Sequence, residues 1–181
     1  MGAFLSLSVV ARTLAYLDSV AWEPALSGLD GGVYSDRRAS TFACEGEGLE
    51  IDTIVSAYLQ SRGLVDAESR EFVKYVGSGQ GQELHHDMGD LDDSTGEISI
   101  RCGSSESHRL FTLVVYLTTN VGGCTNFPRQ RFRFAPRAGA ALFWQNGSSP
   151  SRPYHCAVHE GQPPLATETK IALLVHARWA M

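Results

Sequence analysis

Residues 71–76 read EFVKYV, a short apolar run rich in β-branched and aromatic side chains that ends at the glycine-containing turn GSGQG, residues 77–81. Runs of this kind, bounded by turn-forming residues, are typical of β-strands. The same pattern predicts further strands near residues 97–101, 109–118, 130–135, 140–145 and 170–179. Many short strands without helices between them indicate a β-sandwich or a barrel.

The residues before this region have a different pattern. Apolar side chains recur at the spacing of an amphipathic helix at Ile51, Ile54, Val55, Tyr58 and Leu59. Gly63 is expected to close that helix. An earlier amphipathic helix is expected to end near Trp22, and residues 27–48, rich in glycine, serine and acidic side chains, predict a loop.

Length and composition favour one domain spanning residues 1–181, because domains typically contain about 100–200 residues. The chain is 43% hydrophobic and 19% charged, so it can bury a core of its own. We expect residues 1–70 to supply supporting helices and a loop, and residues 71–181 to form a β-rich core. The predicted class is mostly β with N-terminal helices, an α+β arrangement.

The net charge of -5 gives no general attraction to nucleic acid or to an anionic membrane surface. No apolar run reaches the roughly 18 residues of a membrane-spanning helix. Gly2 lies in a Met-Gly-x-x-x-Ser sequence that fits the loose N-myristoylation pattern. Four cysteines without a C-x-x-C pair fit a reducing compartment, which predicts a cytoplasmic location, but they leave an extracellular disulfide pair open.

A histidine and an aspartate follow the first strand in an H-x-D pattern, at His85 and Asp87. On extended backbone, residues i and i+2 point the same way. One histidine from a neighbouring strand would complete a facial site of two histidines and one carboxylate, which suits iron(II) and leaves coordination positions open. His155 and His159 are both candidates for that histidine, and the same ligands could also serve zinc with a bound water.

Several motifs together resemble the prolyl 4-hydroxylase-like family of iron(II)- and 2-oxoglutarate-dependent dioxygenases. The resemblance rests on T-x-x-x-Y-L at residues 112–117, G-G-x-T-x-F-P at 122–128, the proline- and glycine-containing segment 136–143 and H-x-G-x-P at 159–163, with Lys170 eleven residues after its histidine. Of the two candidate histidines, this favours His159. Cys124 departs from the pattern, because it replaces an acidic residue of the family.

The resemblance implies a double-stranded β-helix, also called a jelly roll, with iron(II) held by His85, Asp87 and His159. It implies 2-oxoglutarate as co-substrate, with its far carboxylate meeting Lys170 and the hydroxyls of Tyr75 and Thr112, and ascorbate as an auxiliary reductant. The expected reaction is hydroxylation of an unactivated C–H bond in a prolyl, peptidyl or amino-acid-type substrate, with release of succinate and CO₂.

Two other functions remain open at this stage. The chain could be a non-enzymatic jelly roll that binds a ligand or partner, or a zinc hydrolase that uses the same three residues. Lys170 argues against the hydrolase, since hydrolysis needs no anchor for a dicarboxylate. His176 has no matching partner in the sequence, so an ordinary hydrogen-bonded or surface role is expected for it.

Overall fold

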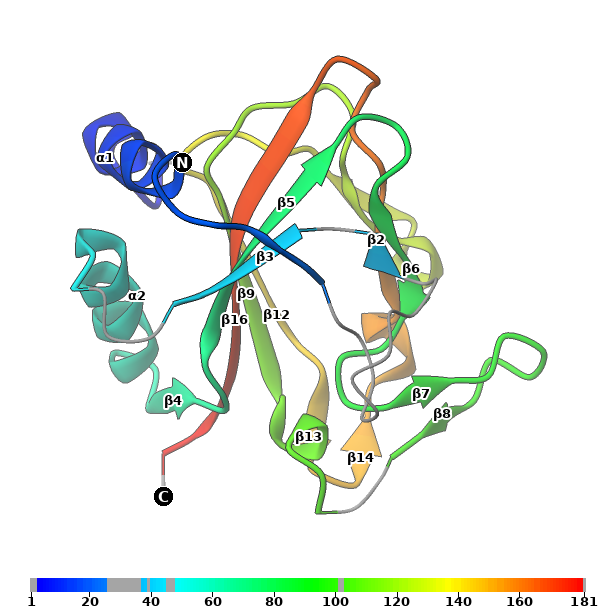
Figure 1. Cartoon of the computed structure of the whole chain (residues 1–181). Coiled ribbons are helices and arrows are strands. Elements are labelled where there is room, and N and C mark those ends of the chain that lie inside the picture. Colours follow the sequence, from blue (N-terminus) through cyan, green and yellow to red (C-terminus); the bar gives the residue numbers. More distant parts are fainter. Residues whose placement is uncertain (1–2, 26–36, 39, 45–47, 101–102, 181) are drawn as a thin grey trace.

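The computed structural model describes residues 3–25, 37–38, 40–44, 48–100 and 103–180 (Figure 1). Gly2, with its acylation pattern, lies outside these ranges. Within them, no helix has the length and apolar character needed to cross a membrane.

Two antiparallel sheets make up most of the structure. The larger has the strand order β1-β3-β5-β16-β9-β12, and β4 also pairs with β16. Its strands are β1 (Glu23–Pro24), β3 (Ser40–Cys44), β4 (Leu64–Asp66), β5 (Arg70–Val76), β9 (Phe111–Tyr116), β12 (Ala141–Gln145) and β16 (Thr169–Trp179).

The smaller sheet has the order β11-β10-β15-β6-β2. Its strands are β2 (Arg37–Arg38), β6 (Gly81–His85), β10 (Thr125–Phe127), β11 (Phe132–Phe134) and β15 (His159–Gly161). Two hairpins accompany the sheets: β7 (Asp90–Leu91) with β8 (Ile98–Ser99), and β13 (Gly147–Ser149) with β14 (Arg152–Pro153). The predicted mostly β, jelly-roll class is confirmed.

Both helices cover one face of the larger sheet, on the side away from the smaller sheet (Figure 1). They are α1 (Leu7–Leu17) and α2 (Glu50–Gln60). The hydroxyl of Ser6 caps α1 by accepting a hydrogen bond from the Val9 amide at 3.3 Å. Leu17, Ile51, Val55 and Leu59 are buried against the sheet.

Side chains along β16 point alternately to the two faces of the larger sheet, and apolar residues on each face are buried. Leu173, Val175 and Ala177 pack in the core beneath the helices, whereas Ala172 and Leu174 pack on the opposite face, toward the smaller sheet. Because side chains alternate along a strand, Lys170 and His176 share the face of Ala172. That inner face is where polar side chains gather.

Three expectations about the N-terminal part need correction. The first helix ends at Leu17 and not near Trp22; the Trp22 indole instead donates to the Leu17 carbonyl at 3.2 Å, packing the chain back on the helix end. The segment 27–48 is not only loop, because β2 and β3 form there. Strands before residue 70 also join both sheets, so this part supplies more than helices and a loop. The composition of residues 27–48 favours a loop, but β3 pairs with β5 and β2 pairs with β6, and this pairing stabilises them as strands.

Candidate active site

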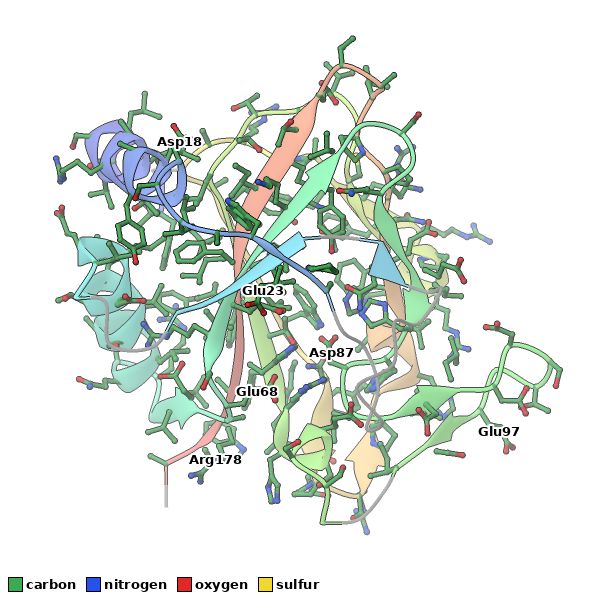
Figure 2. All side chains as sticks on the ribbon, in the orientation of Figure 1. Asp18, Glu23, Glu68, Asp87, Glu97 and Arg178 are labelled. Atoms are coloured by element: carbon green, nitrogen blue, oxygen red, sulfur yellow. The ribbon has the colours of Figure 1, made fainter. Side chains whose placement is uncertain are left out.

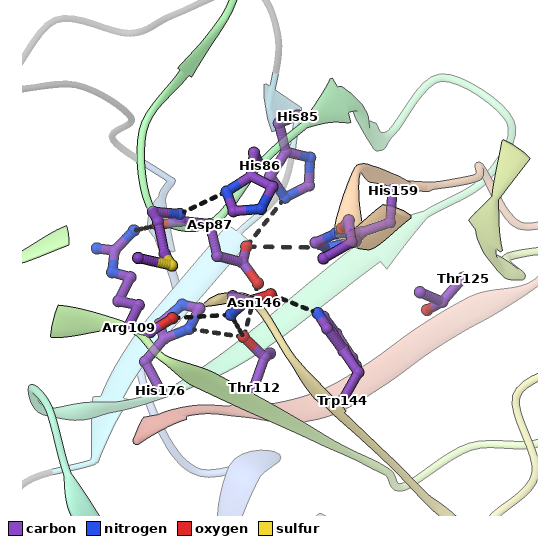
Figure 3. Close-up of polar contacts among 12 residues, drawn as sticks. His85, His86, Asp87, Arg109, Thr112, Thr125, Trp144, Asn146, His159 and His176 are labelled. Atoms are coloured by element: carbon purple, nitrogen blue, oxygen red, sulfur yellow. Dashed lines mark hydrogen bonds and ion pairs between the residues drawn. The ribbon is translucent and has the colours of Figure 1, made fainter. Parts of the chain in front are cut away.

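Three side chains meet between the sheets, and the smaller sheet holds two of them. His85 ends β6 and His159 begins β15, and the two are direct partners in the antiparallel register. Asp87 follows β6 by two residues. The Nε2 atoms of His85 and His159 lie 3.3 Å and 3.8 Å from Asp87 Oδ1, and all three ligand atoms lie within 4.8 Å of one another (Figure 3).

Both imidazoles are oriented by the backbone. Nδ1 of His85 lies 2.8 Å from the Glu83 carbonyl, and Nδ1 of His159 lies 3.0 Å from the Ala157 carbonyl. A carbonyl oxygen can only accept, so each Nδ1 carries a proton, and Nε2, which faces Asp87, is the nitrogen left to bind a metal. This is the usual arrangement for metal-ligating histidines.

Electrostatics keep His159 and Asp87 in forms that can bind a metal. Burial lowers the pKa of His159 to about 4, although Asp87 opposes this effect. Burial alone would raise the pKa of Asp87, but the imidazoles of His159, His85 and His176 hold it well below its usual value. Near neutral pH the site therefore presents a neutral His159 and a carboxylate.

Asp87 lies in the interior between the sheets, while Glu97 projects from the loop that joins β7 and β8 (Figure 2). Aromatic rings shield the metal-site histidines from one side: the rings of Trp144 and Phe127 lie 4.8 Å and 5.3 Å from that of His159, measured between centroids. The donor set and its enclosure fit a metal ion of the iron(II) type.

Lys170 lies farther along the same inner face, and its side chain is only 3% exposed. It is the register partner of Tyr75 on β5, and its Nζ lies 5.1 Å from the centre of the Tyr75 ring and 5.7 Å from that of Tyr116. Among the described residues, none forms an ion pair or a hydrogen bond with the ammonium group. Burial lowers the pKa of Lys170 to about 8, with Cys124 opposing. A buried cation of this kind fits an anionic ligand.

A chain of contacts links the surroundings of Lys170 to the strand that carries His159. Tyr116, beside Lys170, forms a 2.7 Å hydrogen bond with Thr125. Thr125 pairs with Gly161, two residues along β15 from His159. The inner face around Lys170 is therefore continuous with the strand that carries His159.

Thr112 is not where the resemblance led us to expect it. Its hydroxyl donates to Asp87 Oδ2 at 2.6 Å, and its register partner on β16 is His176, six residues from Lys170. The structure therefore does not bring Thr112 to Lys170. Thr112 supports the metal-site carboxylate instead.

His155 lies apart from the three metal-site side chains. It is exposed, in a short turn at His155–Ala157, and its Nδ1 lies 3.3 Å from the guanidinium of Arg129. The structure thus brings His159, and not His155, to His85 and Asp87. Cys124 and Cys156 are free thiols. Cys124 is buried, and the guanidinium of Arg133 donates to its sulfur at 3.7 Å.

The sequence model of the 2OG-Fe(II) oxygenase superfamily matches residues 71–179, which is more than half of the chain. The chain belongs to this superfamily. The match begins at β5 and ends with β16, so it includes His85, Asp87, His159 and Lys170.

Solved structures share the fold of this oxygenase at low sequence identity. A viral collagen prolyl hydroxylase from Paramecium Bursaria Chlorella virus-1, in complex with 2-oxoglutarate, is similar with a TM-score of 0.71 and 19% identity, covering 99% of this chain and 94% of the other. A Trichoplax adhaerens prolyl hydroxylase, in complex with a hypoxia inducible factor peptide fragment, has a TM-score of 0.68 and 16% identity, covering 98% and 81%.

A third similar structure carries a different activity. The 2-oxoglutarate-dependent epimerase SnoN from nogalamycin biosynthesis has a TM-score of 0.60 and 14% identity, covering 98% of this oxygenase and 76% of that chain. No curated protein sequence matches the oxygenase. The fold alone therefore leaves the substrate open.

Sequence reasoning missed four residues of this site. Asn146, Trp144, Tyr116 and His176 all line it. The alternation of side chains along a strand could have identified two of them, because Tyr116 lies on the same face as Thr112 and His176 lies on the same face as Lys170. Nothing in the sequence around Asn146 indicates its contact with Thr112.

Proposed function

We propose that this oxygenase binds iron(II) through His85, Asp87 and His159 and uses 2-oxoglutarate to oxidise an unactivated C–H bond of its substrate. The observation that carries the proposal is a three-ligand site together with a buried lysine on the same inner face, whose ammonium has no ion-pair or hydrogen-bond partner in the described parts of the chain. A zinc hydrolase would need the three metal ligands, and a simple binding protein would need a pocket. Neither function needs a buried lysine at position 170.

Lys170 would bind the far carboxylate of 2-oxoglutarate through a charge-assisted contact. Tyr75 and Tyr116 flank its ammonium and would line the same end of the pocket. Tyr116 takes the place that the sequence assigned to Thr112. When bound, iron and 2-oxoglutarate supply dioxygen activation coupled to decarboxylation, which gives succinate and CO₂. The protein orients the ligands and excludes water through Trp144 and Phe127.

The proposed substrate is of prolyl, peptidyl or amino-acid type. Two of the similar structures are prolyl hydroxylases, and one of them is bound to a peptide fragment. We also propose that ascorbate supports turnover and that the protein works in the cytoplasm, where the free thiols Cys124 and Cys156 would stay reduced. Because β3 and β4 pair with β5 and β16, we propose that the whole chain acts as one catalytic domain.

Succinate formation from 2-oxoglutarate tests the proposal. Purified protein is incubated with iron(II), 2-oxoglutarate, ascorbate and a panel of proline-containing peptides and free amino acids, and succinate is measured. We expect succinate that requires iron and rises with a productive substrate. Formation that persists in the His85→Ala/Asp87→Ala double variant would overturn the proposal.

The affinity for 2-oxoglutarate is expected to fall as the pH rises above about 8, the pKa of Lys170. Below that pH the free protein already carries the ammonium charge, whereas above it binding must take up a proton, so the affinity declines by up to about tenfold per pH unit. Of the groups around Lys170, Cys124 favours its charged form and Arg133 contacts Cys124. Tyr75 and Tyr116 flank it, and burial raises the pKa of Tyr116, which stays neutral.

Calorimetric titration of the Mn(II)-loaded protein between about pH 7 and 9 measures this dependence. Heats recorded in two buffers of different ionisation enthalpy report the proton taken up. A dissociation constant that stays flat across this range would contradict the assignment of Lys170 as the anchor.

A further inference from the structure

The two oxygens of Asp87 have different surroundings. Oδ1 faces both imidazoles, at 3.3 Å from His85 Nε2 and 3.8 Å from His159 Nε2. Oδ2 accepts a 2.6 Å hydrogen bond from the hydroxyl of Thr112, on the side away from the histidines (Figure 3). The carboxylate is therefore oriented so that one oxygen points to the metal position and the other is held by the protein.

Two further side chains contact the oxygen of Thr112. The single hydroxyl proton goes to Asp87, which as a carboxylate can only accept, so the Thr112 oxygen acts as acceptor toward its other neighbours. Those neighbours are Asn146 Nδ2 at 2.7 Å and His176 Nδ1 at 3.2 Å. His176 Nδ1 must then carry a proton and donate it. All four side chains are buried, with exposures of 7% or less.

His176 is in turn connected to the backbone of Asp87 by two charged side chains. Its Nε2 lies 3.7 Å from a carboxylate oxygen of Glu68, whose other oxygen accepts from Arg109 at 2.9 Å. Arg109 also donates to the backbone carbonyl of Asp87, at 3.4 Å. The contacts form a closed ring from Asp87 through Thr112, His176, Glu68 and Arg109. The link between His176 and Glu68 is a contact at 3.7 Å, and the other links of the ring are hydrogen bonds.

We propose that His176 is a positioning residue that acts through Thr112 to keep Asp87 Oδ2 off the metal, so that only Oδ1 is a ligand. An iron that holds two imidazoles and one carboxylate oxygen keeps room for a two-point chelate and for dioxygen. If Oδ2 also bound the metal, it would occupy one of those positions. The inference rests on the metal site proposed above, and it concerns how that site is kept open.

Cobalt(II) is the probe, because its visible absorption reports coordination number and its titration reports affinity. We compare wild type, Thr112→Val, His176→Leu and the double variant, with the exposed His108→Leu as matched control. Loss of an outer hydrogen-bond partner costs about 10–100-fold in metal affinity. We expect about this loss for Thr112→Val, a smaller loss of about 3–10-fold for His176→Leu and no change for His108→Leu.

The double variant decides whether His176 acts through Thr112. We expect it to bind cobalt(II) no more weakly than Thr112→Val alone, and both variants to show the same changed spectrum, because residues in one network are not additive. Losses that multiply, or a His176→Leu spectrum and affinity equal to those of wild type, would overturn the inference.

Two further variants keep the test decisive if His176→Leu does not fold. Thr112→Ser retains the hydroxyl and His176→Asn retains a donor near Nδ1, so both should keep the wild-type spectrum. A His176→Asn protein that folds but loses cobalt(II) as Thr112→Val does would count against the inference. Failure of the wild type itself to bind cobalt(II) would instead count against the proposed function.

Discussion

Replacing Asp87 with alanine is expected to lower the affinity for iron(II) by at least about 100-fold, since losing an outer hydrogen-bond partner of a ligand already costs about 10–100-fold. Asp87 supplies the only carboxylate among the three metal-site side chains, and its Oδ1 faces both imidazoles. Without it, only the two imidazoles remain as ligands. 2-Oxoglutarate-dependent succinate formation should fall to background.

Metal titration and a melting curve measure this effect, with Asp93→Ala as the control because Asp93 is an exposed carboxylate in the loop between β7 and β8. The fold should persist in Asp87→Ala, because removing a buried carboxylate also removes its desolvation cost. An Asp87→Ala protein that melts as a cooperative unit and still binds iron(II) like wild type would show that the metal lies elsewhere.

Replacing Lys170 with methionine should have opposite effects on binding and on stability. We expect the affinity for 2-oxoglutarate to fall by about 100-fold, or about 3 kcal/mol, because a buried charge pair is lost. The unliganded protein should become more stable by about 1–3 kcal/mol near pH 7, since a buried ammonium without an ion partner is replaced by an apolar side chain of similar length. Metal affinity should not change.

Lys74→Met is the matched control for this variant. Lys74 is a lysine of the neighbouring strand β5, and its ammonium lies 4.1 Å from the centre of the Trp22 ring, on the helix-covered side of the larger sheet. The Lys74→Met variant should bind 2-oxoglutarate like wild type. Denaturant unfolding measures the free energy of unfolding of each variant, and calorimetry measures its affinity for 2-oxoglutarate. A Lys170→Met protein that is less stable and binds 2-oxoglutarate normally would mean that Lys170 is a structural residue.

The sequence predicts the long apolar strands, and also the short strands β8 and β11, but it misses other short polar ones. β5, β9, β12 and β16 are long or strongly apolar, and each overlaps a predicted strand. β6, β10 and β15 contain three to five residues each and include polar side chains, so no apolar run marks them. These three form much of the smaller sheet, and their pairing is what brings His159 opposite His85.

The sequence predicts those site residues whose positions follow from motif spacing. It does not predict those whose contacts depend on how the strands pack. H-x-D places His85 and Asp87 on one face, and the motif at residues 159–163 separates His159 from His155. The contacts of the Thr112 hydroxyl depend on which β16 residue lies opposite Thr112. That strand register is set by the tertiary structure and cannot be read from the sequence. The role of Asn146 likewise arises from a contact between strands distant in sequence.

A crystal structure of the protein with Mn(II) and 2-oxoglutarate would test the proposed site directly. We expect one metal ion bound by Nε2 of His85, Oδ1 of Asp87 and Nε2 of His159, with 2-oxoglutarate chelating it and its far carboxylate against the ammonium of Lys170. A metal held by other residues, or a 2-oxoglutarate molecule that does not reach Lys170, would contradict it.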